Sequence, residues 1–335
     1  MTGTGTLRVE TSRGETPRVE APRLEPPRLE TPRLETEYRP RHPLDLMRVV
    51  GFQQRGRNDP TATIEHGVIW RAMRTPEGVA AIALREVSRG VIRAAAWGPG
   101  RAHAIAHVPA LCGHDDDPGA FDPGPHPLVR DTHHRNPGLR LGRTDTVFDA
   151  LACAIFEQKV TGMQAFGAWR RIVTWFGERV PAPAPRPLFA PPGIDDWRMI
   201  PSWAWHRAGL EPPQSRTIVA AARRGHAIVR AATAASDPHE RERVLTALNG
   251  VGPWTSAEVR IRAWGDPDAV SVGDAHLSHE VGYALAGART DDAGMLDLLD
   301  PWAGQRQRVI RLIGASGVRE PRRAPRLHPE DHRAR

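Results

Sequence analysis

The chain has 335 residues, of which 40% are apolar, 25% are charged and 6% are aromatic. This composition excludes a collagen, a wholly disordered chain and a membrane protein, and the length allows two or three domains. The formal charge of +7 weakly favours a polyanionic partner, although arginine supplies every basic residue except Lys159. Two cysteines are too few for a disulfide scaffold, a four-cysteine zinc site or an iron–sulfur cluster. We expect a cytoplasmic protein without a membrane segment.

The N-terminus repeats a five-residue unit that carries a proline in every copy, from residue 15 to residue 34. Proline lacks an amide donor and biases its predecessor towards extended geometry, so a helix is excluded. We expect residues 1–42 to be a disordered tail. Residues 317–335 are rich in arginine and interrupted by proline, and they predict a second, basic tail.

A mixed α/β domain is expected over residues 43–125. Its three β-prone runs, residues 68–73, 79–84 and 91–97, are separated by Pro-Glu-Gly and Ser-Arg-Gly. These turn signals predict an antiparallel meander. Residues 111–127 are loop-like, and we interpret their three adjacent aspartates, residues 115–117, as part of a solvated linker rather than as a metal site.

Helical patterning dominates residues 126–316. Apolar side chains recur at helical spacing within residues 148–156 and 166–176. Further helices are expected near residues 195, 214, 240, 253 and 291, and the proline-rich residues 180–192 predict a loop. The expected fold class is therefore α+β, with a small antiparallel sheet domain followed by an all-helical domain.

The segment of residues 244–260 predicts two helices joined by the turn Leu-Asn-Gly-Val-Gly. Gly250 and Gly252 allow a tight turn, and Pro253 fits the first turn of a helix, where its missing amide costs nothing. The amides of Gly250, Val251 and Gly252 would bind a phosphate through the partial positive charge at a helix start. A plain connection between two helices remains the alternative.

Three segments together resemble the helix-hairpin-helix DNA glycosylases: residues 248–255 (the hairpin), 272–277 (the Gly/Pro-Asp loop) and 155–161 (a segment that enters DNA). The β-rich segment resembles the N-terminal domain of the AlkA-type 3-methyladenine glycosylases. The resemblance implies a monomer that excises alkylated purines from duplex DNA in base excision repair, at the cytoplasmic nucleoid. It implies no organic cofactor and no metal centre, apart from a monovalent cation at the hairpin.

Asp274 is the expected catalytic residue. Breaking an N-glycosidic bond leaves an electron-poor, oxocarbenium-like sugar, which a nearby carboxylate stabilises while it helps to activate water. The alternative is that Asp274 only caps the helix that begins near Ala275, and one carboxylate could serve both purposes.

Trp254 and Glu258 are expected in the base pocket. Trp254 stands where bifunctional members of the resembling family carry a lysine nucleophile, so the resemblance implies a monofunctional enzyme; core packing is the alternative. Glu258 departs from the aromatic residue that the alkylpurine branch has there. Three readings stay open: contact with a cationic base or an exocyclic amine, solvent exposure, or a salt bridge to an arginine.

The remaining candidates flank these motifs. Trp203, Trp205 and His276 are expected in the base pocket, although the two indoles fit a hydrophobic corner equally well. Gln158, Lys159 and Thr255 are expected at the DNA, with Lys159 contacting a phosphate or the orphaned base.

Two other functions stay open. The first is a glycosylase that acts on an oxidised or deaminated base. Glu258 leaves this function open, because a neutral lesion tolerates a carboxylate differently from a cationic one. A catalytically silent damage-binding protein would use the hairpin for phosphate alone, and Asp274, which repels a polyanion, argues against it.

Overall fold

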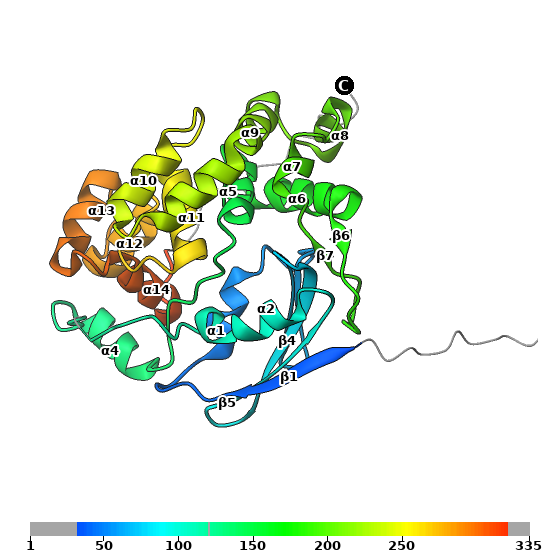
Figure 1. Ribbon diagram of the computed structural model, residues 1–335. Helices are drawn as coiled ribbons and strands as arrows, with labels where there is room; N and C mark the ends of the chain where they lie inside the picture. Colours follow the sequence, from blue (N-terminus) through cyan, green and yellow to red (C-terminus); the bar gives the residue numbers. More distant parts are fainter. Residues whose placement is uncertain (1–31, 120, 321–335) are drawn as a thin grey trace, which may run out of the picture. The chain divides into compact units, whose positions relative to one another are not determined.

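The computed structural model describes residues 32–119 and 121–320. Five strands form one antiparallel sheet in the order β1-β5-β4-β3-β2 (Figure 1). The strands are β1 (Arg33–Tyr38), β2 (Ala62–Glu65), β3 (Val68–Thr75), β4 (Gly78–Ser88) and β5 (Val91–Trp97). The predicted meander is confirmed as β3, β4 and β5, which pair in sequence order.

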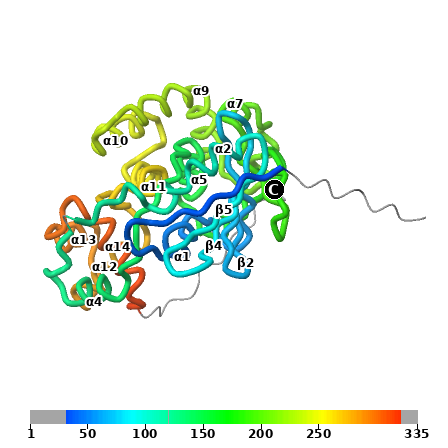
Figure 2. The backbone as a smooth tube through the Cα atoms, turned by 60° about the horizontal axis from the view of Figure 1, so that its bottom comes forward, coloured from blue at the N-terminus to red at the C-terminus, as the bar shows by residue number. Residues whose placement is uncertain are grey.

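Strand β1 corrects the expected extent of the N-terminal tail, because six residues assigned to the tail lie in the sheet. β1 pairs with β5, with Arg33 opposite Trp97 and Tyr38 opposite Ile92, and Figure 2 shows the two segments side by side. The segment between Pro32 and Pro40 contains no proline and offers a full set of amide donors. Residues 1–31 of the expected tail lie outside the described residues.

Both faces of the sheet are covered. Helices α1 (Leu46–Val49), α2 (Arg101–Ala106) and α3 (Val108–Leu111) pack with apolar side chains of the sheet on one face. On the other face, Ala190 and the segment between the short strands β6 (Glu178–Arg179) and β7 (Phe189–Ala190) pack against β3 and β4. The proline-rich loop therefore folds back onto the sheet. Contrary to our expectation, the C-terminal region is not wholly helical.

Eleven further helices follow α3 among the described residues. They are α4 (Pro127–Arg135), α5 (Val147–Phe156), α6 (Gly162–Phe176), α7 (Ile194–Trp197), α8 (Ser202–Ala208), α9 (Pro212–Ala234), α10 (Pro238–Thr246), α11 (Pro253–Trp264), α12 (Leu277–Ala286), α13 (Asp292–Leu299) and α14 (Arg306–Ser316). Two 3₁₀ helices are η1 (Gly51–Gln53) and η2 (Asp300–Trp302). The helices expected near residues 195, 214, 240, 253 and 291 are confirmed, and the fold class is α+β.

Two hydrophobic cores hold these helices. In the first, α5 is the central helix: all of its residues except Asp149 are buried, among side chains of α6 to α9 and α11. The second core joins α4 to α12, α13 and α14. None of the described helices is long and apolar enough to cross a bilayer. Of the expected basic tail, residues 317–320 are described, and Glu320 pairs with Arg289.

Candidate active site

The hairpin has the geometry that its glycines predicted. Between α10 and α11, Gly250 adopts φ +85°, in the left-handed region that favours glycine. A Cβ there would also lie 2.4 Å from Thr217 Oγ1, so a side chain is excluded by space as well. Gly252 precedes Pro253 at the start of α11. The predicted helix-hairpin-helix is therefore present, with the turn at residues 247–252.

Gln158 ties the end of α5 to this hairpin. Its Nε2 donates to the carbonyl of Gly250 and to Thr255 Oγ1, both at 2.8 Å. Gln214 Nε2 in turn donates to the Gln158 carbonyl at 2.9 Å. Gln158 and Thr255 thus hold the hairpin in place. Lys159 is exposed beside them and adopts φ +55°, which a lysine rarely does.

Asp274 makes the contacts expected of a residue that caps a helix start, and its catalytic role stays a prediction. Its Oδ1 accepts the amides of His276 at 2.9 Å and Leu277 at 3.0 Å, at the start of α12. Its Oδ2 accepts the indole N–H of Trp254 at 3.1 Å. Three donors therefore fix the carboxylate, and one of them comes from the helix that follows the hairpin.

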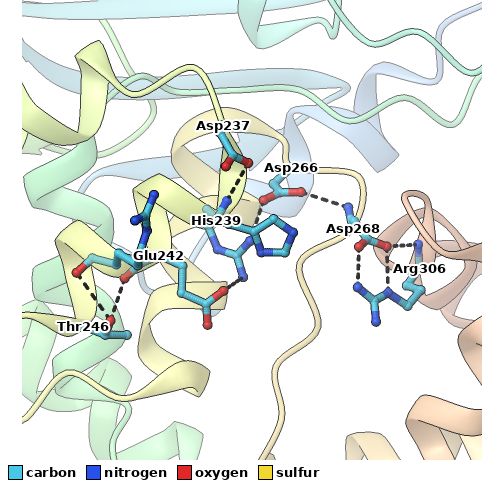
Figure 3. Close-up of polar contacts among 9 residues, drawn as sticks. Asp237, His239, Glu242, Thr246, Asp266, Asp268 and Arg306 are labelled. Carbon is cyan, nitrogen blue, oxygen red and sulfur yellow. Dashed lines mark hydrogen bonds and ion pairs between the residues drawn. The ribbon is translucent and has the colours of Figure 1, made fainter.

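A chain of charged contacts supports the segment between α11 and Asp274 (Figure 3). Arg260 pairs with Glu242 of α10 at 3.2 Å and with Asp266 at 2.9 Å. Asp266 Oδ1 accepts the amide of Asp268, and the Asp268 carboxylate accepts two side-chain donors of Arg306 at the start of α14. The segment is thus held from α10, α11 and α14.

Asp274 lines a pocket of about 670 Å³, a volume typical of ligand sites. Residues of α1, η1, α11, α12, α14 and the loop of residues 271–276 surround it. Of the predicted pocket residues, Glu258 and His276 line it, together with Asp274, the expected catalytic residue. The charged or titratable residues of the lining are Arg48, Glu258, Arg262, Asp274, His276, Glu280 and Arg311.

Trp203 and Trp205, both expected in the base pocket, are not among the residues that line the pocket of Asp274. The two residues stand two positions apart on α8 and so point in different directions. Trp203 is 59% exposed, whereas Trp205 is buried, stacks on Trp197 and donates its indole N–H to the Ile200 carbonyl. Trp205 belongs to the hydrophobic core, and neither indole lines the pocket. Trp254 is not among the lining residues either, although it bonds to Asp274.

Glu258 makes the salt bridge that was one of its three readings, and it does so in the pocket wall. Its Oε1 accepts the Ser271 hydroxyl at 2.7 Å, and its Oε2 lies 3.5 Å from Arg262 Nε. Arg262 also donates to the Phe52 carbonyl at 3.2 Å and places its guanidinium 4.6 Å from the centre of the Phe52 ring.

Sequence reasoning missed the opposite wall, which is formed by Phe52 and Arg311. The guanidinium carbon of Arg311 lies 3.7 Å from the Phe52 ring centre, and its Nη2 donates to the Arg48 carbonyl at 2.6 Å. Burial, together with the charges of Arg262 and Arg48, lowers the pKa of Arg311 to about 10. No local sequence pattern indicates that these two residues meet, because α14 and η1 lie at opposite ends of the chain.

Two carbonyls of the hairpin, where a monovalent cation was expected, already accept hydrogen bonds. The Leu248 carbonyl accepts the Val251 amide, and the Gly250 carbonyl accepts Gln158. Because a carbonyl oxygen has a second lone pair, the cation stays a prediction. In the part of the chain that the structure describes, no group of three histidine, cysteine or acidic side chains could hold a metal ion.

No protein-family model and no curated protein matches this sequence. Solved structures do match the fold. A 3-methyladenine DNA glycosylase from Archaeoglobus fulgidus superposes with a TM-score of 0.69 at 18% identity, covering 83% of this chain and 97% of that one. The apo 8-oxoguanine glycosylase/lyase of Clostridium acetobutylicum gives 0.66 at 12% identity, covering 84% and 96%.

The same Clostridium enzyme in complex with duplex DNA containing cytosine opposite 8-oxoguanine gives a TM-score of 0.62 at 10% identity, again covering 84% and 96%. The likeness extends over nearly the whole of each neighbour, sheet and helices together. The chain therefore has the fold of the helix-hairpin-helix DNA glycosylases.

Proposed function

We propose that this protein is a DNA glycosylase of base excision repair. It binds duplex DNA through the hairpin, extrudes a damaged purine into the pocket and hydrolyses the N-glycosidic bond with Asp274, which leaves an abasic site. From the resemblance we further propose that it acts as a monomer on nucleoid DNA in the cytoplasm.

The observation that carries this proposal is the hydrogen bond from Trp254 Nε1 to Asp274 Oδ2. Trp254 stands two residues after Gly252, the last of the three residues whose amides would hold a phosphate. The bond therefore joins the DNA-binding turn to a carboxylate on the pocket wall. A fixed negative charge at this place repels a polyanion, so it favours chemistry over DNA binding alone.

In the proposed reaction the bond between C1′ and the base nitrogen breaks, and its electron pair leaves with the base. The sugar is left as an oxocarbenium-like cation, which the Asp274 carboxylate stabilises. Water then adds to C1′ and gives up a proton, which Asp274 helps to remove. The two backbone donors on Oδ1 keep the carboxylate oriented throughout.

We propose a monofunctional hydrolase. The indole of Trp254 serves as a hydrogen-bond donor to Asp274 and has no nucleophilic amine. Lys159, the only lysine, does not line the pocket that holds Asp274. An amine-dependent lyase step on the sugar therefore has no candidate side chain there.

Two lesion classes are candidates. From the resemblance we propose an alkylated purine. The neighbour from Archaeoglobus fulgidus is named for such a base, 3-methyladenine. The carboxylate of Glu258 in the pocket wall favours an oxidised or deaminated purine instead, because it replaces an aromatic surface by a hydrogen-bond acceptor.

The test is base release from duplexes that contain 7-methylguanine, 3-methyladenine, hypoxanthine or 8-oxoguanine. We expect alkali-dependent strand breaks with at least one lesion, reduced on the order of 10²–10⁴-fold in Asp274→Asn. Asp297→Asn, on the exposed side of α13, is the matched control and should retain full activity. Binding without release from any lesion would contradict the proposal and favour a damage-binding protein.

A further inference from the structure

Helix α9 carries a positive charge that the proposed reaction does not use. Its 23 residues include no acidic residue and four arginines: Arg216, Arg223, Arg224 and Arg230. All four are exposed, and their side chains form no hydrogen bond or ion pair with any of the described residues. The neighbouring α10, in contrast, alternates two glutamates with two arginines. The charge of α9 is therefore available to a partner outside the chain.

Three of these arginines form one straight row, the arginine stripe: Arg216, Arg223 and Arg230. They stand seven residues apart, which is close to two full turns, so their side chains leave the same side of the helix. The row lies opposite the buried side of α9, whose residues recur at the same spacing, as from Ile218 to Gly225. At a rise of 1.5 Å per residue the arginine stripe is about 21 Å long.

Small side chains accompany the arginine stripe. Ala220, Ala227 and Ala234 lie on the same side of α9 and are exposed. An alanine side chain has no donor or acceptor with which to distinguish one base from another, and it lets a large partner come close to the helix. The surface therefore suits a partner that is recognised by negative charge repeated along a line.

The arginine stripe begins beside the hairpin. Gln214, in the first turn of α9, donates to the carbonyl of Gln158 at 2.9 Å, and Gln158 donates to the carbonyl of Gly250. The side chain of Thr217 occupies the space next to Gly250. Arg216 stands between these two residues of α9, so the rest of the stripe leads away from the hairpin along the helix (Figure 1).

We propose that the arginine stripe binds the phosphate backbone of one arm of the duplex, outside the contact made by the hairpin. Guanidinium groups bind phosphate oxygens through paired N–H donors. A stripe of about 21 Å matches about six base pairs at 3.4 Å each. Contacts of this kind position DNA without reading its sequence. The inference rests on the proposed function for its partner, duplex DNA, and it needs no step at Asp274.

The test is the salt dependence of DNA affinity for the full-length protein. The probe is a duplex of about 30 base pairs with a central tetrahydrofuran analogue of an abasic site, measured between about 50 and 200 mM salt. The wild type is compared with the triple variant Arg216→Gln/Arg223→Gln/Arg230→Gln. Glutamine has nearly the helix propensity of arginine, so the variant should fold.

Each phosphate contact adds about 0.9 to the slope of the logarithm of affinity against the logarithm of salt concentration. With three contacts removed, the wild type should lose about 40-fold more affinity over this range than the variant does. A difference below about threefold corresponds to less than one contact and would overturn the proposal.

The matched control is Arg85→Gln/Arg89→Gln/Arg179→Gln. These three arginines are exposed residues of β4, of the turn after it and of β6, and the variant loses the same charge. It should keep the salt dependence of the wild type. An equal change in the control would assign the effect to net charge and overturn the assignment to α9.

Shortened duplexes test the assignment to one arm. Each arm in turn is cut to about four base pairs, which is shorter than the arginine stripe. Because the stripe extends from one side of the hairpin, only one of the two truncations should abolish the difference between wild type and stripe variant. A difference that survives both truncations would point to a second DNA segment or another polyanion and overturn the proposal, as would a difference that either truncation abolishes.

Base release separates this inference from the proposed function. Asp274→Asn should keep the salt dependence of the wild type while it loses base release. A salt dependence that differs in the stripe variant, without base release from any lesion by the wild type, would support the stripe and contradict the hydrolase. Base release with equal salt dependence in the two proteins would support the hydrolase and overturn the stripe.

Discussion

The pocket has two walls that are built in different ways. The hairpin wall consists of α11 and the loop of residues 271–276, so Trp254, Glu258 and Asp274 come from one short stretch of chain. The sheet wall consists of α1, η1 and α14, where Arg311 bonds to Arg48 across 263 residues of sequence. The proposed chemistry belongs to the first wall. A local stretch thus suffices to place the Asp274 carboxylate beside the hairpin, whereas the second wall needs the assembled fold.

The largest of the following effects concerns the link between the two walls. Arg55 follows η1, is buried, and pairs with Glu157, the neighbour of Gln158. Arg55→Met leaves the Glu157 carboxylate unpaired in a site where it is only 18% exposed. We expect unfolding stability to fall by about 3 kcal/mol in chemical denaturation, since breaking a buried ion pair leaves an uncompensated charge.

Arg93→Met is the control for this change, because Arg93 pairs with Glu37 and the two side chains are 46% and 45% exposed. It should cost no more than about 1 kcal/mol. Equal losses in the two variants would mean that the sheet and the hairpin are coupled by packing and not by the Arg55 pair. Adding Glu157→Gln to Arg55→Met should recover part of the loss.

A smaller effect is confined to the hairpin wall. Trp254→Phe keeps a ring but removes the N–H that Asp274 accepts at 3.1 Å. We expect base release under saturating enzyme to slow about tenfold, with DNA affinity unchanged, because only the orientation of the carboxylate is lost. Trp175→Phe, on the partly exposed surface of α6, should leave both quantities as they are. A loss of affinity with unchanged release would instead assign Trp254 to binding.

A pH-dependent effect tests the contact of the sheet with α5. Asp149 lines a cavity of about 40 Å³ together with Arg55 and Arg71, and burial raises its pKa to about 7, against the opposing charges of Arg74 and Arg71. The folded state therefore holds this proton more tightly than the unfolded chain, and stability is lost as the pH rises from the usual value of 3.8 through 7.

Asp149→Asn removes this linkage. We expect its stability relative to the wild type, measured by denaturant unfolding, to increase from pH 5 to pH 8 and to level off above. A difference that is constant with pH would show that Asp149 is already charged at pH 5 in the folded protein.

The sequence predicted the hairpin wall because its signals are local. The glycine turn at residues 250–252 and the spacing from Trp254 to Asp274 are visible without any tertiary information. Phe52 and Arg311 gave no such signal, since an arginine becomes part of a wall only when a distant helix brings it to a ring. For the same reason, the indoles of Trp203 and Trp205 could not be divided between surface and core, and β1 required its partner β5 to be recognised as a strand.

The expectation for the three adjacent aspartates was likewise wrong for one of them. Asp116 is buried against Arg308 and accepts the Leu141 amide at 3.1 Å, so it is not part of a solvated linker. An acidic run is usually solvated. Here Asp116 is buried because Arg308, 192 residues away in sequence, pairs with it.

The left-handed turn at Lys159 gives the protein a built-in place for a reporter. Lys159 carries the only side-chain amine of the chain. It is exposed and lies next to Gln158, which donates a hydrogen bond to the hairpin. An amine-reactive fluorophore would therefore mark a single side chain at the edge of the expected DNA footprint. Its emission would follow the encounter with a duplex in real time, without a cysteine having to be introduced and with both buried thiols left untouched.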